Sequence, residues 1–168
     1  LADEDPDVDA IYRLTSDKSC NFKSVKPVVL GPKSITPFNT QNTIIRKELF
    51  PLMYLPSHVT FRFTDILRGL IAQPIMWAYG YHLGYTTATV IQRRNPHDYY
   101  KDFISEIPMY QYGEDVVKIV ESVISKNESI IDNLHNSYVA LKDEGIVPEK
   151  ELLVLNAWLK DLEVISSI

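Results

Sequence analysis

The chain has 168 residues, of which 45% are hydrophobic, and this is enough apolar side chain to build one compact core. Its net charge of -5 and isoelectric point near 5.3 argue against general nucleic-acid binding, because that function relies on a basic surface that displaces counterions from phosphates. Cys20 is the only cysteine, so an intrachain disulfide is excluded, while the compartment is left open. The sequence contains no apolar run that approaches the roughly 20 residues needed to cross a bilayer.

The acidic opening of the chain, DEDPDVD at residues 3–9, has two interpretations. Its Asp-x-Asp spacings are typical of a divalent-metal site, because carboxylates are ligands of hard cations. A metal-binding pair normally ends a buried strand, however, and no apolar strand precedes these residues, so we favour a solvated acidic turn. The sequence begins at Leu1 instead of a methionine, which suggests a processed chain or a fragment.

Residues 16–34 are polar and contain proline and glycine, which predicts a loop with one brief strand at Val28–Leu30. The following segment, PFNTQNT at residues 37–43, is rich in amides, including Asn39 and Asn42. Amides both donate and accept hydrogen bonds, which suits the hydroxyl groups of sugars. Asparagine-rich turns also form for purely local reasons, so this segment predicts either a sugar-binding loop or a turn alone.

Alternating apolar residues at positions 59–64 predict a strand with Arg62 on its polar face. Thr64 can then cap a helix whose apolar positions, from Ile66 to Tyr81, follow the three-and-four spacing of one buried stripe. We expect Pro74 to kink this helix, because proline lacks a backbone donor and crowds the carbonyl four residues earlier.

Asp65 and Arg68 lie three positions apart, on a different side of this helix from the apolar stripe. A carboxylate in the first turn is stabilised as an anion by the helix dipole, and an arginine one turn later can position it or bind a substrate oxygen. The alternative is an ordinary intrahelical ion pair without a function.

A second strand is predicted at residues 85–92, followed at once by a helix that Asn95 caps. Arg93 and Arg94 precede the amino end of this helix, where free backbone N–H groups attract anions such as phosphate. His97 adds an imidazole, and a neutral imidazole can ligate a divalent metal that bridges a diphosphate. The alternative is that the arginines bind surface carboxylates and that His97 is solvated.

Three blocks, PFNTQNT, TFRFTDILRGLIAQPIMW and QRRNPHDY, occur in the same order in the STELLO-type, DUF288-like glycosyltransferase family, and the chain resembles that family over most of residues 5–103. The resemblance implies an α/β fold of the GT-A type, in which a mixed sheet is flanked by helices and a nucleotide-sugar binds beside a divalent metal, Mn or Mg. By similarity, Asp65 would act as the base and His97 would complete the metal and diphosphate site. The resemblance also implies a Golgi or secretory location if an anchor precedes Leu1.

We expect two parts: residues 1–112 as the glycosyltransferase-like α/β core, and residues 113–168 as a helical C-terminal layer packed on it. The C-terminal part carries apolar helical stripes without site chemistry, which predicts a supporting layer or a surface for a protein partner. The Rossmann-like half that binds the nucleotide and carries the Asp-x-Asp metal motif in GT-A enzymes is not recognisable in this sequence. The chain therefore resembles the acceptor-side half of such a domain.

The predicted function is metal-assisted transfer of a sugar from a nucleotide-sugar to a glycan or another hydroxyl acceptor, with Asp65 as the base. The predicted substrate-binding residues are Asn39, Asn42, Arg62, Arg68, Arg93 and Arg94, and the predicted metal ligand is His97. Two alternatives remain open: a non-catalytic interaction module whose C-terminal helices dock a partner, and a sugar-binding domain without transfer activity.

Overall fold

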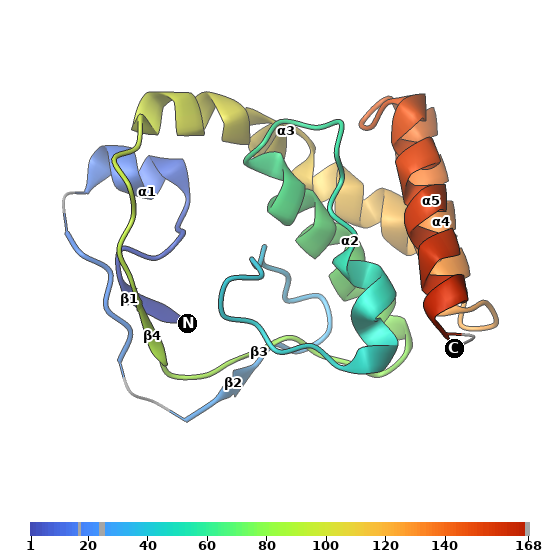
Figure 1. Ribbon diagram of the computed structural model, residues 1–168, viewed down its shortest axis with the longest axis horizontal. Coiled ribbons are helices and arrows are strands. Elements are labelled where there is room, and N and C mark those ends of the chain that lie inside the picture. The colour runs from blue at the N-terminus through green and yellow to red at the C-terminus, as the bar shows by residue number, and fades with distance from the viewer. Residues whose placement is uncertain (17, 24–25, 167–168) are drawn as a thin grey trace.

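The computed structural model describes residues 1–16, 18–23 and 26–166, and about half of them lie in helices (Figure 1). The elements in chain order are β1 (Ala2–Glu4), α1 (Ala10–Thr15), β2 (Val28–Val29), the 3-10 helix η1 (Lys47–Met53), α2 (Phe63–Ala78), β3 (Gly84–Tyr85), β4 (Val90–Gln92), α3 (Tyr99–Val123), α4 (Ile130–Asp143) and α5 (Glu149–Ser166). None of the helices within the described residues is both long enough and apolar enough to span a membrane.

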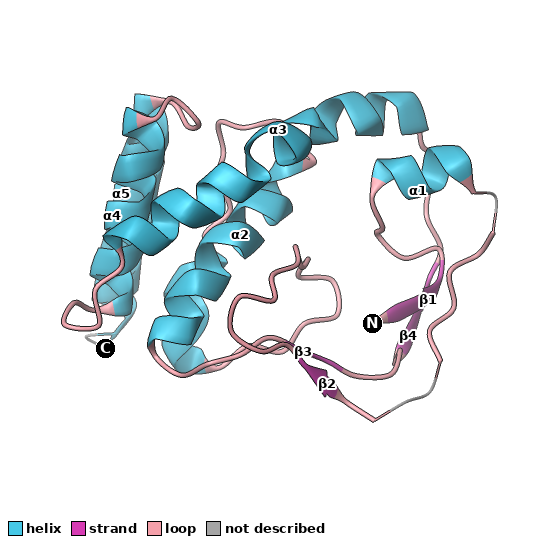
Figure 2. Cartoon of the chain, turned by 180° about the vertical axis from the view of Figure 1, so that it is seen from behind, coloured by secondary structure: helices cyan, strands magenta, loops and turns pink. Residues whose placement is uncertain are grey.

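The strands form two small sheets of two strands each. Strand β1 pairs with β4 in parallel, with Ala2 opposite Val90 and Glu4 opposite Gln92. Strand β2 pairs with β3 in antiparallel, which confirms the brief strand predicted near Val28. Both sheets lie away from the α4–α5 helix pair (Figure 2). The predicted α/β class is therefore confirmed, with helices as the dominant element.

Helix α2 forms the centre of the hydrophobic core. Every residue from Leu67 to Met76 is buried, and Leu67 and Ile75 have no exposed surface. Because α3, α4 and η1 all contact α2, the helix can be apolar on most of its circumference and still be shielded from water. Each fully buried leucine or isoleucine contributes about 1.5–3 kcal/mol. The predicted helix is confirmed, with Pro74 inside it.

The C-terminal helices are attached to this core by a buried carboxylate. Glu151, in the first turn of α5, accepts hydrogen bonds from the backbone N–H groups of Ser57 at 3.0 Å and His58 at 2.7 Å, and from the Tyr54 hydroxyl. Helix α5 therefore fixes the segment that leads into α2. Helix α3 runs unbroken from Tyr99 to Val123, through the boundary predicted between residues 112 and 113, and the division into two parts stays a prediction.

The strand predicted at residues 59–64 is wrong. These residues form a turn in which the Phe63 N–H donates to the Thr60 carbonyl at 2.9 Å, and α2 begins at Phe63. Arg62, not Thr64, occupies the cap position of α2. The turn is held from outside, because the Thr60 hydroxyl and the Arg62 N–H bond to Ser105 on α3 at 2.6 and 3.0 Å. These tertiary contacts outweigh a local alternation of only six residues.

The structure of residues 85–99 differs from the predicted strand and helix in two ways. The strand expected at residues 85–92 is interrupted, since only its two ends belong to β3 and β4. The helix expected to start after Asn95 starts at Tyr99 instead, because the Asp98 side chain caps it by accepting the Lys101 N–H at 3.2 Å. His97 therefore precedes the cap and lies outside the first turn of α3.

Candidate functional site

The candidate site lies where two parallel strands end. Strands β1 and β4 run in the same direction, so the residues that follow them emerge at the same edge. Asp5 and Asp7 follow β1, and Arg93 and Arg94 follow β4. In α/β proteins ligands bind most often at the carboxyl ends of parallel strands. The pairing of the two strands therefore brings acidic residues from the start of the chain next to basic residues from its middle.

Asp7 joins two of the predicted site arginines. Its Oδ1 atom accepts from Nη1 of Arg62 at 2.7 Å and from Nη2 of Arg94 at 3.0 Å. The Arg62 and Arg94 side chains are 12% and 9% exposed, so the ion pairs are shielded from solvent. The arrangement confines both guanidinium groups, because a charge buried without its partner would be unstable.

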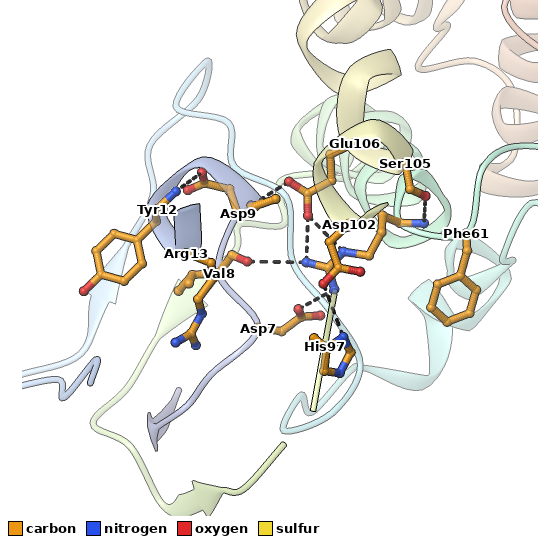
Figure 3. A network of polar contacts seen from close by, with 12 residues as sticks. Asp7, Val8, Asp9, Tyr12, Arg13, Phe61, His97, Asp102, Ser105 and Glu106 are labelled. Carbon is orange, nitrogen blue, oxygen red and sulfur yellow. Dashed lines mark hydrogen bonds and ion pairs between the residues drawn. The ribbon is translucent and has the colours of Figure 1, made fainter. Parts of the chain in front are cut away.

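Glu106 is the second anion of this network, and sequence reasoning missed it. Its Oε1 atom accepts from Nε and Nη2 of Arg62 at 2.9 and 2.7 Å, while Oε2 accepts the Ala10 N–H at 2.8 Å (Figure 3). Burial lowers the pKa of Arg62, but Asp7 and Glu106 raise it by more, so the guanidinium remains charged. Glu106 thus joins α3 to the starts of both α1 and α2.

The acidic opening is not the solvated turn that we predicted. Asp3 accepts the Phe22 N–H at 2.8 Å, Asp5 pairs with Arg13, and Asp9 caps α1 by accepting the Tyr12 N–H at 2.9 Å. The prediction failed because β1 exists only through its pairing with β4, which lies far along the chain. A strand therefore does carry the Asp-x-Asp spacing, although no apolar run marks it.

His97 has a carboxylate partner on α3. Its Nδ1 atom lies 3.2 Å from Oδ2 of Asp102, and the imidazole is one-third exposed (Figure 3). An imidazole directed at a carboxylate through Nδ1 has its Nε2 atom left for a ligand, which is the arrangement common among metal-binding histidines. Within the described residues, however, no group of three or more His, Cys, Asp or Glu could hold a metal ion. The described residues therefore bring together at most two such side chains as ligands of the predicted metal.

Arg93 and Arg94 do not act as a pair. Arg93 is 88% exposed, and its nearest carboxylate, on Glu4, is 3.9 Å away. Arg94 is buried against Asp7. Of the two, only Arg93 has a guanidinium that a phosphate could reach without breaking a short ion pair.

Asp65 lies in the first turn of α2 with its side chain 35% exposed. Burial raises the pKa of this carboxyl, the nearby Arg68 opposes that rise, and the charges of Asp7 and Arg62 also act on it. Asp65 is therefore within electrostatic range of the Asp7 network, and its side chain is partly exposed to solvent. Arg68, predicted as a substrate ligand, is only 1% exposed, and its Nη1 atom lies 3.9 Å from Oδ1 of Asp65.

The predicted amide ligands lie elsewhere. Asn42 donates to the Leu1 carbonyl at 2.7 Å and to the Thr89 hydroxyl at 3.0 Å, and these two residues directly precede β1 and β4. Asn42 is thus at the amino ends of the strands, opposite the charged edge. The Asn39 side chain accepts the Gln41 N–H at 3.2 Å, a contact of the kind expected for a local turn.

The sequence of this chain, compared with known proteins, matches one protein family. A family described as STELLO glycosyltransferases matches residues 62–167, which is more than half of the chain. The chain belongs to this family. It is 25% identical over 163 residues to the probable glycosyltransferase STELLO1 of Arabidopsis thaliana, and 23% identical over 163 residues to the probable glycosyltransferase STELLO2 of the same plant. Each alignment covers 94% of this chain and 21% of the relative, so the chain spans about a fifth of the length of these proteins.

Proposed function

We propose that this chain forms the acceptor-side part of a metal-assisted glycosyltransferase domain with a GT-A-like mixed sheet. In the proposed reaction a sugar passes from a nucleotide-sugar to a hydroxyl acceptor, and the nucleoside diphosphate leaves. The observation that carries the proposal is the convergence of acidic and basic residues at the carboxyl ends of β1 and β4, the usual ligand edge of a parallel sheet. Membership of the STELLO family supports it.

Asp65 is the proposed base. Its side chain is partly exposed at the head of α2, and burial raises the pKa of its carboxyl group, which makes the carboxylate a stronger base for proton abstraction. The acceptor hydroxyl gives its proton to Asp65, and the acceptor oxygen forms the new bond to the sugar carbon as the bond to the diphosphate breaks. The charge of Arg62 also acts on this carboxylate, while the Arg62 guanidinium is itself held by Asp7 and Glu106.

Arg93 and His97 are the proposed residues on the diphosphate side. The exposed guanidinium of Arg93 suits a phosphate oxygen, since arginine binds phosphate through charged hydrogen bonds. His97, with Nδ1 on Asp102, would give one ligand to a divalent cation, Mn or Mg, and such a cation would neutralise charge on the leaving diphosphate. The remaining metal ligands would be phosphate oxygens, water and carboxylates other than those of the Asp7 and Glu106 network.

The proposal is tested by titrating UDP-sugars, with Mn²⁺ present, into the full-length natural polypeptide and by measuring transfer. We expect His97→Ala to weaken donor binding, and Asp65→Asn to leave donor binding unchanged while it lowers transfer by about 10²–10⁴-fold. His82→Ala is the control, because His82 is exposed and follows the far end of α2. Unchanged donor binding in His97→Ala, or full transfer by Asp65→Asn, would overturn the site assignment.

A non-catalytic interaction module is the second candidate function, and one observation favours it. Arg62 and Arg94 are already neutralised by Asp7 and Glu106, so the network as it stands resembles a structural clamp. Phe50, which packs against the partly buried Trp158, is exposed, and so are Leu55 and Leu153, so these apolar side chains are available to a partner. If Asp65→Asn retained biological activity and Leu153→Glu abolished it, the interaction module would replace the enzyme.

A further inference from the structure

Arg68 is a buried guanidinium whose donors are not satisfied. Its side chain is 1% exposed, and its Nε and Nη1 atoms are buried without a hydrogen-bond partner among the described residues. The other buried atoms in this condition, on Asp5 and Arg13, belong to two side chains that form an ion pair with each other. Arg68 has no such short contact with a carboxylate, and a buried unsatisfied polar group in a native protein calls for an explanation.

The guanidinium of Arg68 is held by one loop residue, Phe38. Its Nη2 atom donates to the Phe38 carbonyl, and its Cζ atom lies 4.9 Å from the centre of the Phe38 ring. That loop is itself fixed to α2, because the Gln73 side chain donates to the Thr36 carbonyl at 2.6 Å. These two contacts restrain the Arg68 guanidinium, so we expect its free Nε and Nη1 donors to stay near the positions that they have in the structure.

The carboxylate in reach of these free donors is Asp65. Its Oδ1 atom lies 3.9 Å from Nη1 of Arg68, one turn earlier on the same helix, so a shift of about 1 Å would give a hydrogen-bonded ion pair. The other charged groups that act on Asp65 are Arg62 and Asp7, which belong to the network already described, and Tyr138 faces Arg68 from α4. Asp65 thus lies between solvent and a fixed, incompletely paired cation.

We infer that Arg68 is a positioning residue for Asp65: its unpaired donors bind one carboxylate oxygen and leave the other directed at the acceptor. This inference rests on the proposed role of Asp65 as the base. The fixed charge holds the carboxylate in one rotamer and keeps it ionised before the reaction. When Asp65 takes the acceptor proton, the ion pair weakens, and Arg68 then favours return of that proton to solvent. The loop at residues 36–38 is part of this device, because Phe38 holds the guanidinium in place.

The test is an NMR titration of the Asp65 carboxyl carbon, identified by its absence in Asp65→Asn. We expect Arg68→Met to raise the pKa of Asp65 by one unit or more, about a tenfold loss of acidity, since a cation within about 4–6 Å of a carboxylate normally lowers its pKa by 1–3 units. Arg68→Lys keeps the charge, and its Asp65 should titrate near the wild-type pH. Arg46→Met is the control, because Arg46 is 68% exposed and pairs with Glu48.

An unchanged Asp65 titration in Arg68→Met overturns the inference. If Arg68→Met does not fold, Phe38→Leu provides the second measurement, because it removes the ring that holds the guanidinium while the charge stays; the same titration curve as wild type would overturn the inference. The transfer assay separates the two proposals. Full transfer by Asp65→Asn together with a shifted titration in Arg68→Met supports the ion pair and overturns the base. Lost transfer by Asp65→Asn together with an unshifted titration supports the base and overturns the role of Arg68.

Discussion

The Oδ1 atom of Asp7 lies 3.0 Å from Nη2 of Arg94, although 87 residues separate the two in sequence. The same oxygen accepts a hydrogen bond from Arg62, at the start of α2. One carboxylate therefore joins the end of β1, the end of β4 and the head of the central helix. Because a two-stranded parallel sheet has little stability of its own, we expect this ionic junction to contribute to fixing the β1–β4 pair relative to the helices.

Removing that junction should destabilise the fold. In Asp7→Ala, Arg94 loses its largely shielded counter-charge and Arg62 retains only Glu106. We expect a loss of about 3 kcal/mol in the free energy of unfolding, measured by urea denaturation, because breaking a buried ion pair leaves an uncompensated charge. Asp115→Ala is the matched control, since Asp115 is 64% exposed and should change the stability by less than about 0.5 kcal/mol. Equal midpoints for the two variants would show that the junction is not structural.

The sequence pattern was sufficient to predict the helices, because their apolar positions recur at helical spacing. The stripe from Ile66 to Tyr81 predicted α2, and the apolar stripes after residue 112 predicted the helical C-terminal part that contains α4 and α5. Strand β1 and the turn at residues 59–62 escaped prediction because distant partners, β4 and Ser105, create them. Glu106 escaped for a related reason: on a helix it has the pattern of a solvated position, and only the fold brings Arg62 and the Ala10 N–H to it.

Asp65 should make the stability of the protein depend on pH in a definite direction. Burial raises its pKa in the folded state above the ordinary value of 3.8, so the folded protein retains this proton to a higher pH than the unfolded chain does. The contribution of Asp65 to stability is therefore complete below pH 3.8 and is lost as the pH rises through the folded-state pKa. Asp65→Asn mimics the protonated form.

We accordingly expect Asp65→Asn to be more stable than the wild type at pH 7, with a difference that shrinks towards zero as the pH falls to 3.8. Thermal unfolding between pH 4 and pH 8 measures it. A gain in stability together with a loss of transfer would be typical of a functional carboxylate that lowers the stability of the folded protein. A wild type that is more stable at pH 7 would mean that Arg68 stabilises the ionised carboxylate by more than burial destabilises it.

Glu151 should be the most sensitive carboxylate of the C-terminal helices. It is fully buried and accepts the Ser57 and His58 N–H groups together with the Tyr54 hydroxyl, so Glu151→Ala leaves these three donors, one of them on the buried Tyr54, without this acceptor. We expect a loss of about 3 kcal/mol, from the desolvation of those donors and the cavity. Glu149→Ala, in the same first turn but exposed, should cost less than about 1 kcal/mol through the helix dipole. Similar urea midpoints for the two variants would contradict a role for Glu151 in attaching α5.

Two glycines on facing helices should respond to alanine with opposite signs. A Cβ atom at Gly69 on α2 would lie 3.2 Å from the Phe38 nitrogen and 3.3 Å from the Pro37 Cα, both of them backbone atoms of the loop that holds Arg68. At Gly113 on α3 the nearest atom to a Cβ is Cδ1 of Leu70, at an ordinary 3.7 Å. Alanine is favoured over glycine within a helix by about 1 kcal/mol, and this preference applies to both positions. The two positions therefore differ mainly in the room available for a Cβ atom.

We expect Gly113→Ala to stabilise the protein by about 0.5–1 kcal/mol and Gly69→Ala to destabilise it by about 1–2 kcal/mol, because the backbone contact must be relieved by moving the loop. Urea denaturation of both variants measures the difference. The loop displacement should also move Phe38 away from Arg68, so Gly69→Ala should raise the pKa of Asp65 in the direction expected for Arg68→Met, while Gly113→Ala leaves it unchanged. Stabilisation by both alanines would show that the loop at residues 36–38 yields freely and does not hold the guanidinium.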